Sequence, residues 1–240
     1  MKRMLPLALL LTGGACAGTA PPPAPSAAIA PDAIALRPGW RSTVIAERDD
    51  SIVLTLPSGD RQLQRIHRVA TFTLSTGPTG AVSTHLDSVR SEPSGGGAPE
   101  LASLVQQLVP RLPASGARPN SSWSDSARGP TSIDIFKVTE RRNAAWTSGA
   151  LTRAAGGQTL PIRLREEFEQ IGSGSRDDQR LTYTSQGRRT GTYYLNSSGR
   201  LTSAQLRDSS TISIGVPASK ALMSGTRVTR TEIRFVPVRE

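Results

Sequence analysis

The stretch Gln179–Ile214 reads QRLTYTSQGRRTGTYYLNSSGRLTSAQLRDSSTISI and sets the architecture of the chain. It is rich in threonine, tyrosine, leucine and isoleucine, which suit a half-buried pleated surface. Two polar joints that contain glycine, QGRRTG at 186–191 and NSSG at 196–199, separate three such runs. Glycine supplies the backbone geometry of tight turns, so this stretch predicts an antiparallel meander of three strands.

The last of the three runs has the period of a strand with one buried face, because apolar and polar residues alternate along it. The same alternation occurs in Arg61–Thr76 and Ala81–Arg90, which the turn residues Gly77-Pro78-Thr79-Gly80 join into a hairpin. The apolar residues that share a face are Ala204, Leu206, Ile212 and Ile214 in the last run, and Ile66, Ala70, Phe72 and Leu74 in Arg61–Thr76.

Further strands are expected along the rest of the chain, and short turns join most of them. Such turns favour antiparallel pairing. Residues Ala114–Pro130 have the composition of a loop, and residues 47–50 that of a polar joint. The expected strands are Trp40–Ala46, Ser51–Leu56, Ile133–Glu140, Trp146–Arg153, Leu160–Ile171 and Arg227–Val238.

One amphipathic helix is expected at residues 99–109. Pro99 and Glu100 suit a first helical turn, and Pro110 ends the pattern. The apolar stripe between them either closes a lipid-sized cavity or packs on the open face of the sheet. The chain is therefore expected to be mainly β, a curved antiparallel sheet or half-barrel of about ten to twelve strands with this one inserted helix. The stripe consists of Leu101, Leu104, Val105, Leu108 and Val109.

The first sixteen residues have the pattern of an export signal. Lys2 and Arg3 precede an apolar segment, Leu5–Leu11, that is too short to span a bilayer. Small residues, Gly13-Gly14-Ala15, lead to Cys16. This motif resembles the lipobox of bacterial lipoproteins, and the resemblance implies that Cys16 carries acyl chains such as palmitate.

Two features bear on that resemblance. The family prefers leucine where Gly13 stands, and Ala15-Cys16-Ala17 also fits the A-x-A site of ordinary signal peptidase, which would release a soluble secreted protein. Cys16 is the only cysteine, so no intramolecular disulfide can form. In lipoproteins of the diderm type, Ala17 after the cysteine implies an outer membrane lipoprotein of the cell envelope, facing the periplasm.

The sequence divides the chain into a signal peptide at 1–16, an Ala/Pro-rich linker at 17–38 and a single β-rich domain at 39–240. The linker cannot bury enough apolar surface to offset the entropy of ordering it. Only 36% of the residues are hydrophobic and 4% aromatic, so the core of the domain is expected to be thin.

The chain is strongly basic, with a formal net charge of +10. Its arginines are scattered singly and interleaved with acidic residues, and export removes the chain from nucleic acid, so no nucleic acid partner is expected. The field of the excess charge would instead attract an anionic envelope component.

The order of the elements loosely resembles the half-barrel of lipoprotein carriers of the LolA type, over about Trp40–Val238. That resemblance implies a curved sheet around a hydrophobic cavity closed by helices, and hence a hydrophobic ligand. It is one of pattern only, so it identifies no ligand-binding residues.

No catalytic, metal or cofactor constellation is found in the sequence. His67 and His85 are the only histidines, Asp87 lies near His85, and no G-x-S-x-G motif is present. The neighbouring acidic residues Asp49-Asp50, Glu166-Glu167 and Asp177-Asp178 would point to opposite faces of a strand, and solvated loops are expected to carry them.

Three functions remain open from the sequence. The first is a lipid-anchored, non-enzymatic envelope protein that binds a hydrophobic ligand in a sheet–helix groove, with the membrane as partner through its N-terminal lipid. The second is an envelope structural or interaction module with a basic face. The third is a secreted hydrolase that uses His85 and Asp87 beside a serine.

Overall fold

The structure, a computed structural model, describes residues 32–93, 104–154 and 157–238. These residues form ten strands in one antiparallel sheet, in the order β3-β2-β1-β10-β9-β8-β7-β5-β4, with β6 beside β7. The expectation of a mainly β protein built on a large antiparallel sheet is confirmed. The strands are β1 Arg41–Thr55, β2 Arg61–Thr76, β3 Val82–Glu92, β4 Ser122–Ile133, β5 Phe136–Ser148, β6 Thr152–Ala154, β7 Gly157–Arg176, β8 Gln179–Asn196, β9 Leu201–Val216 and β10 Ala221–Pro237.

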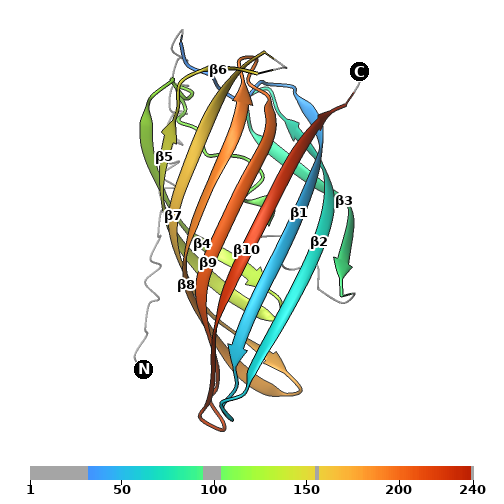
Figure 1. Cartoon of the computed structure of the whole chain (residues 1–240), viewed down its shortest axis with the longest axis vertical. Coiled ribbons are helices and arrows are strands. Elements are labelled where there is room, and N and C mark those ends of the chain that lie inside the picture. Colours follow the sequence, from blue (N-terminus) through green and yellow to red (C-terminus); the bar gives the residue numbers. More distant parts are fainter. Residues whose placement is uncertain (1–31, 94–103, 155–156, 239–240) are drawn as a thin grey trace, which may run out of the picture.

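The sheet curves strongly, so that its long, tilted strands surround an interior (Figure 1). The first strand pairs with the last along most of its length, from Ser42 opposite Pro237 to Thr55 opposite Ser224. The β1–β2 and β9–β10 turns lie at the lower end in Figure 1, and the start of β1 lies at the upper end. The edge strands β3 and β4 do not pair with each other in the described parts of the chain, so the sheet is not closed into a barrel.

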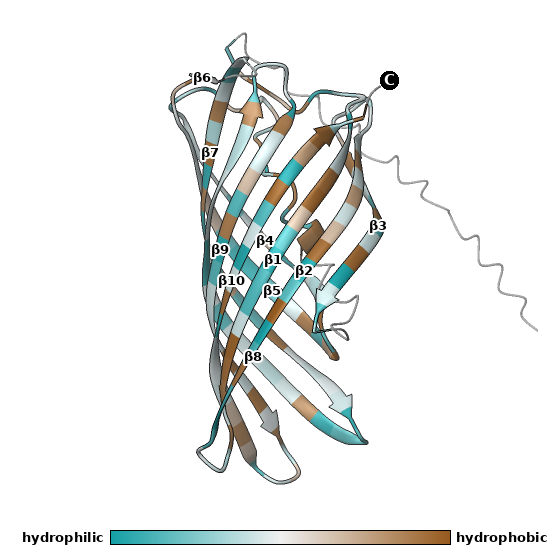
Figure 2. Cartoon of the chain, turned by 45° about the vertical axis from the view of Figure 1, so that its right-hand side comes forward, coloured by the Kyte–Doolittle hydropathy of each residue, from teal (hydrophilic) through white to brown (hydrophobic). Residues whose placement is uncertain are grey.

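Each strand presents alternate residues to the interior and to solvent. Figure 2 shows the resulting alternation of hydrophilic and hydrophobic residues along the strands. In β5, every second side chain from Phe136 to Ser148 is buried and those between are exposed. We call the buried side the inner face and the other the outer face. The predicted assignment of Leu206 and Ile212 to one face is confirmed, since both are buried.

The main apolar core fills the upper end of the interior, and we call it the upper core. The segment after β3 contributes Leu104 and Leu108, both essentially inaccessible to solvent. The hydroxyl of Tyr193 donates a hydrogen bond of 2.8 Å to the carbonyl oxygen of Gln107 and fixes this segment to β8. Other members of the upper core are Trp40, just before β1, and from the sheet Val44, Phe72, Leu74, Trp146, Leu160, Ile162, Leu195, Ile233 and Phe235.

The expected helix at 99–109 is not seen. Residues 99–103 lie outside the described residues, and beyond them only Leu104 and Val105 are helical. The hydrogen bonds Gln107 N to Leu104 O (2.9 Å) and Leu108 N to Val105 O (3.3 Å) span three residues, the spacing of tight turns. The apolar spacing that predicted a helix is used here to bury Leu104 and Leu108 in the upper core.

One of the two joints predicted in the meander is wrong. NSSG at 196–199 is a turn, with Gly199 at φ +77°. QGRRTG at 186–191 instead lies inside β8. Gly187 and Gly191 are needed there for space, because a Cβ on Gly187 would lie 2.5 Å from Cζ of Phe168, and one on Gly191 would lie 2.2 Å from Cδ2 of Leu206.

Two further interpretations of polar residues are wrong. The supposed joint at 47–50 is the middle of β1, where Arg48 and Asp50 point to the inner face. The supposed loop Ala114–Pro130 contains most of β4, a polar strand at the edge of the sheet. An edge position tolerates Gly129 and Pro130, which a central strand would not. Likewise, one strand, β5, runs through Arg141–Ala145, where two strands were expected to be separated.

The described residues begin at Asp32, so the signal peptide, Cys16 and most of the expected linker lie outside them. The end of the linker contacts the domain. Ile34 and Ala117 exchange two backbone hydrogen bonds of 2.9 Å, and the amide of Arg37 donates to the carbonyl of Gly199 at 2.8 Å. Within the described residues, no helix is long and apolar enough to cross a membrane.

Candidate ligand-binding cavity

The lower end of the interior is lined by a second apolar cluster, which we call the lower cluster, and it is not filled. A cavity of about 590 Å³ lies there, within the range of small-molecule binding sites. Its walls come from β1, β2, β7, β8, β9, β10, the β4–β5 turn and Pro93 after β3. The apolar residues that line it are Ile52, Leu54, Leu56, Ile66, Pro93, Ile133, Ile135, Phe136, Leu181, Ile212, Ile214 and Met223, with Tyr183 beside them.

Three glycines at the lower end of the sheet allow neighbouring strands to approach closely. Gly172 and Gly174 in β7 and Gly225 in β10 take inner-face positions at which the upper half of a strand carries a large side chain. Neighbouring backbone approaches all three, since a Cβ on Gly225 would lie 2.1 Å from the carbonyl oxygen of Val53. Neighbouring strands therefore lie close together at these positions, and no side chain from them enters the cavity.

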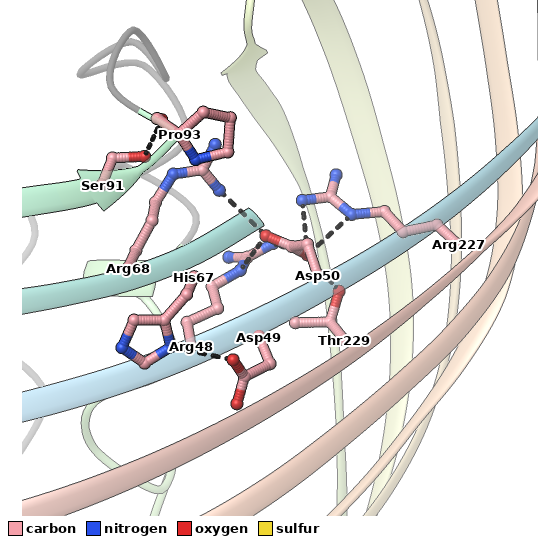
Figure 3. A network of polar contacts seen from close by, with 9 residues as sticks. All are labelled: Arg48, Asp49, Asp50, His67, Arg68, Ser91, Pro93, Arg227 and Thr229. Atoms are coloured by element: carbon pink, nitrogen blue, oxygen red, sulfur yellow. Dashed lines mark hydrogen bonds and ion pairs between the residues drawn. The ribbon is translucent and has the colours of Figure 1, made fainter. Parts of the chain in front are cut away.

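A belt of buried charged residues separates the cavity from the upper core, and its centre is Asp50 (Figure 3). Oδ2 of Asp50 accepts hydrogen bonds from Nε of Arg48 (3.0 Å) and Nη1 of Arg68 (2.9 Å). Oδ1 accepts from Nε and Nη2 of Arg227 (3.0 and 2.9 Å) and from the Thr229 hydroxyl (2.6 Å). Three strands, β1, β2 and β10, are joined through this one carboxylate.

The carboxyl of Asp50 is ionised in the folded protein. Burial would raise its pKa, but the guanidiniums of Arg48 and Arg227 and the hydroxyl of Thr229 outweigh burial. Together they hold the pKa of Asp50 well below its usual range. A carboxylate with several charge-assisted hydrogen bonds is stabilised in its charged form.

The belt continues on the next strands around Arg189 in β8. Its guanidinium donates a short hydrogen bond to Glu166 in β7 and one of 2.9 Å to Asp208 in β9. It also lies 5.2 Å from the ring centre of Phe168. Burial and the nearby carboxylates of Glu140 and Asp208 raise the pKa of Glu166, although Arg189 opposes them.

The belt makes the inner end of the cavity polar. Arg68 and Arg227 line the cavity and bind Asp50 at the same time. An apolar ligand in the cavity would therefore contact hydrocarbon walls along its length and an ion-paired surface at its inner end. Loss of one partner of a buried ion pair leaves an uncompensated charge and is costly. We therefore expect this charged surface to keep its structure when a ligand binds.

The mouth of the cavity carries one basic and one acidic residue. Arg176, the last residue of β7, is exposed and lines the cavity. Asp134, at φ +49° in the β4–β5 turn, lines it as well. The two aspartates that follow Arg176, Asp177 and Asp178, form the tight β7–β8 turn with φ of 49° and 62°.

The structure does not bring the two histidines into one site. The Nδ1 atom of His67 lies 2.8 Å from Oδ1 of Asp49 on the outer face, with both side chains exposed. His85 lies 4.0 Å from Asp87, whose other oxygen accepts a hydrogen bond from Thr73. In the described parts of the chain, neither ring is hydrogen-bonded to a serine, and no three potential metal ligands lie together.

Two of the three acidic pairs do point to opposite faces of a strand, and for these two the interpretation as solvated loop residues is wrong. Asp50 and Glu166 are buried, whereas their neighbours Asp49 and Glu167 are exposed. Only Asp177-Asp178 lies in a turn. The alternation of side chains along the strand predicts the burial of Asp50, because Asp50 falls on the same face as Val44 and Ala46.

No protein-family model and no curated protein sequence matches this chain. Among solved structures, it is matched to a mutant of OmpT that lacks loop L8, an outer membrane protein of Vibrio cholerae, at 5% sequence identity and a TM-score of 0.18. The match covers 82% of this chain and 99% of that one. So low a TM-score supports no inference about fold or function.

Proposed function

We propose that this chain is an exported, lipid-anchored protein of the cell envelope that binds an apolar ligand and catalyses no reaction. The observation that supports ligand binding is the cavity of about 590 Å³ in the lower cluster. A space of that size lined mainly by hydrocarbon side chains, with Gln62 and Gln64 among the polar exceptions, is costly to leave filled with water, so an apolar ligand gains free energy by entering it.

The proposed site differs in position from the groove expected between the sheet and residues 99–109. In the described part of that segment, Leu104 and Leu108 are packed into the upper core. The space lies at the opposite end of the strands, below the charged belt. The ligand would therefore enter between the β1–β2 and β7–β8 turns.

Anchoring rests on the sequence alone. The signal pattern, the lone Cys16 and the Ala/Pro-rich residues 17–31 support a lipid-anchored domain on a short tether. A lipid anchor would hold the cavity close to a membrane surface, where apolar ligands are concentrated. The non-lipidated alternative, a secreted protein with the same cavity, would bind the same ligand in solution.

Native mass spectrometry of the chain purified from its host membrane tests ligand binding. We expect a bound species of constant additional mass that is released by organic extraction and identified in the extract. An empty protein, together with a cavity that stays empty on addition of apolar ligands, would refute the proposal.

A second function, an interaction module with a basic face, is favoured by one observation on the outer face. The strand register places Arg165 opposite Thr190, Thr190 opposite Arg207, and Arg207 opposite Arg230, so three arginines lie on one line across four strands. Sedimentation with anionic phosphatidylglycerol vesicles tests this surface. Binding that disappears when all three arginines are changed to glutamine would support it, and binding that is unchanged would exclude it.

A further inference from the structure

Arg176 occupies a position that binding of a purely apolar ligand would not use. It lies on the inner face of β7 at the mouth of the cavity, whose hydrocarbon wall includes Leu181 and Ile214. Among residues 32–93, 104–154 and 157–238, no hydrogen bond or ion pair joins its side chain to a neighbour. Its five N–H donors therefore face a cavity mouth that is open to water.

We propose that the ligand of the cavity is a single-chain amphiphile whose head group carries anionic oxygens. The chain lies between the apolar walls, and the head group is bound by Arg176 at the mouth. This inference rests on the proposed function, because it specifies the chemical class of the ligand for the same cavity.

Three features favour this class. A charged head group keeps part of its hydration at the mouth, whereas burial deeper in the cavity would remove it. The planar guanidinium of Arg176 matches the geometry of a carboxylate or phosphate and can bind two of its oxygens. The net charge of +10, which falls to +8 when Lys2 and Arg3 leave with the signal peptide, also gives the protein a field that attracts anions.

The other charged residues of the cavity are consistent with a head group at Arg176. Asp134 lines the mouth from the β4–β5 turn and would repel an anion placed beside it. At the inner end, Arg68 and Arg227 are already bonded to Asp50. The end of the chain would therefore meet an ion-paired surface there.

The test is a competition assay on the full mature chain with the neutral fluorescent probe N-phenyl-1-naphthylamine. Dodecanoate, dodecyl phosphate, dodecanol and dodecylammonium are added as competitors below their micelle concentrations. We expect the anionic competitors to displace the probe at concentrations about ten-fold lower than dodecanol or dodecylammonium, because one charge-assisted pair distinguishes them. Whichever of dodecanoate and dodecyl phosphate displaces the probe at the lower concentration identifies the preferred head group.

Arg176→Gln should bring all four competitors to within about two-fold of one another, with the probe itself bound as before. Arg180→Gln is the matched control, since Arg180 lies in the same hairpin, opposite Ser175, but on the outer face. If the probe binds but the head groups do not differ, or if the preference survives Arg176→Gln, this inference is overturned while the proposed function stands. If the probe does not bind at all, the proposed function fails.

Discussion

Arg227 directs its Nε and Nη2 atoms at Oδ1 of Asp50, at 3.0 and 2.9 Å, and so joins the last strand of the sheet to the first. The two residues are 177 positions apart in the sequence. Arg48 and Arg68 donate hydrogen bonds to the other carboxylate oxygen. Asp50 is therefore the common acceptor for three arginines in the middle of the interior.

Asp50→Asn should destabilise the fold severely. The substitution removes the charge shared by the buried Arg48 and Arg68 and the partly buried Arg227, and removal of one partner of a buried ion pair costs about 3–5 kcal/mol. Urea unfolding at neutral pH measures the loss. Asp49→Asn is the control, because Asp49 is exposed on the outer face, and its free energy of unfolding should stay within about 0.5 kcal/mol of the wild type. Equal effects of the two variants would contradict the role of Asp50.

The pKa of Asp50 predicts how stability depends on pH. Because its folded pKa lies below the unfolded value of about 3.9, Asp50 contributes its full stabilisation above that value. The contribution is lost as the pH falls from there through the folded pKa. The difference in free energy of unfolding between wild type and Asp50→Asn should therefore be constant from pH 7 to about pH 5 and shrink below about pH 4. A difference that does not change down to pH 2.5 would be inconsistent with an ionised Asp50.

Gly187→Ala should destabilise the sheet by about 1–3 kcal/mol, the usual cost of overpacking. The new Cβ would meet Cζ of Phe168 at 2.5 Å and the carbonyl oxygen of Ser209 at 2.6 Å. Gly129→Ala in β4 is the control, since nothing lies within 4 Å of a Cβ there. Thermal unfolding compares the two. If both variants unfolded at the same temperature, Gly187 would not be a point of close approach between strands.

Much of the sheet could be predicted from its sequence, and the reasons are local. The predicted run Arg61–Thr76 is β2 itself, because its apolar residues alternate and turn residues flank it on both sides. β4 was missed because an edge strand with polar side chains, SWSDSARGPTSI, has no apolar period to detect. The glycines of QGRRTG suggested a turn, although their purpose depends on Phe168 and Leu206 in neighbouring strands.

The belt and the cavity could be predicted only in part. The alternation of β1 already places Asp50 on its apolar face, but its partners Arg68 and Arg227 lie on strands whose register the sequence does not give. At the lower end of the sheet, Gly172, Gly174 and Gly225 take inner-face positions that carry no large side chain. Such an absence is visible only once the strands are aligned.

Tyr193→Phe should destabilise the upper core by about 1–3 kcal/mol, because the carbonyl of Gln107 loses its buried donor. Tyr194→Phe is the control on the outer face of the same strand. Limited proteolysis adds a second readout, since the Tyr193 variant should be cut faster in the segment 104–112. Unchanged stability and cleavage would show that the hydrogen bond does not hold this segment.

Labelled palmitate should be incorporated at Cys16 when the chain is expressed in a host that processes lipoproteins. Cys16→Ser should abolish the label and release the protein from the membrane fraction, because one acyl-bearing residue supplies the anchor. Labelling that persists in the variant would exclude Cys16 as the acylated residue. A wild type that takes up no label and is found only in the soluble fraction would exclude lipid anchoring and favour plain secretion.

The central claim is that the lower cavity holds a ligand, and titration with N-phenyl-1-naphthylamine tests it most directly. The wild type should bind about one probe per chain, and Met223→Trp, which places a larger side chain among the cavity walls, should weaken binding about ten-fold. Leu222→Trp on the exposed outer face of β10 should bind as the wild type does. A wild type that shows no saturable binding, or a Met223→Trp variant that binds equally well, would contradict the claim.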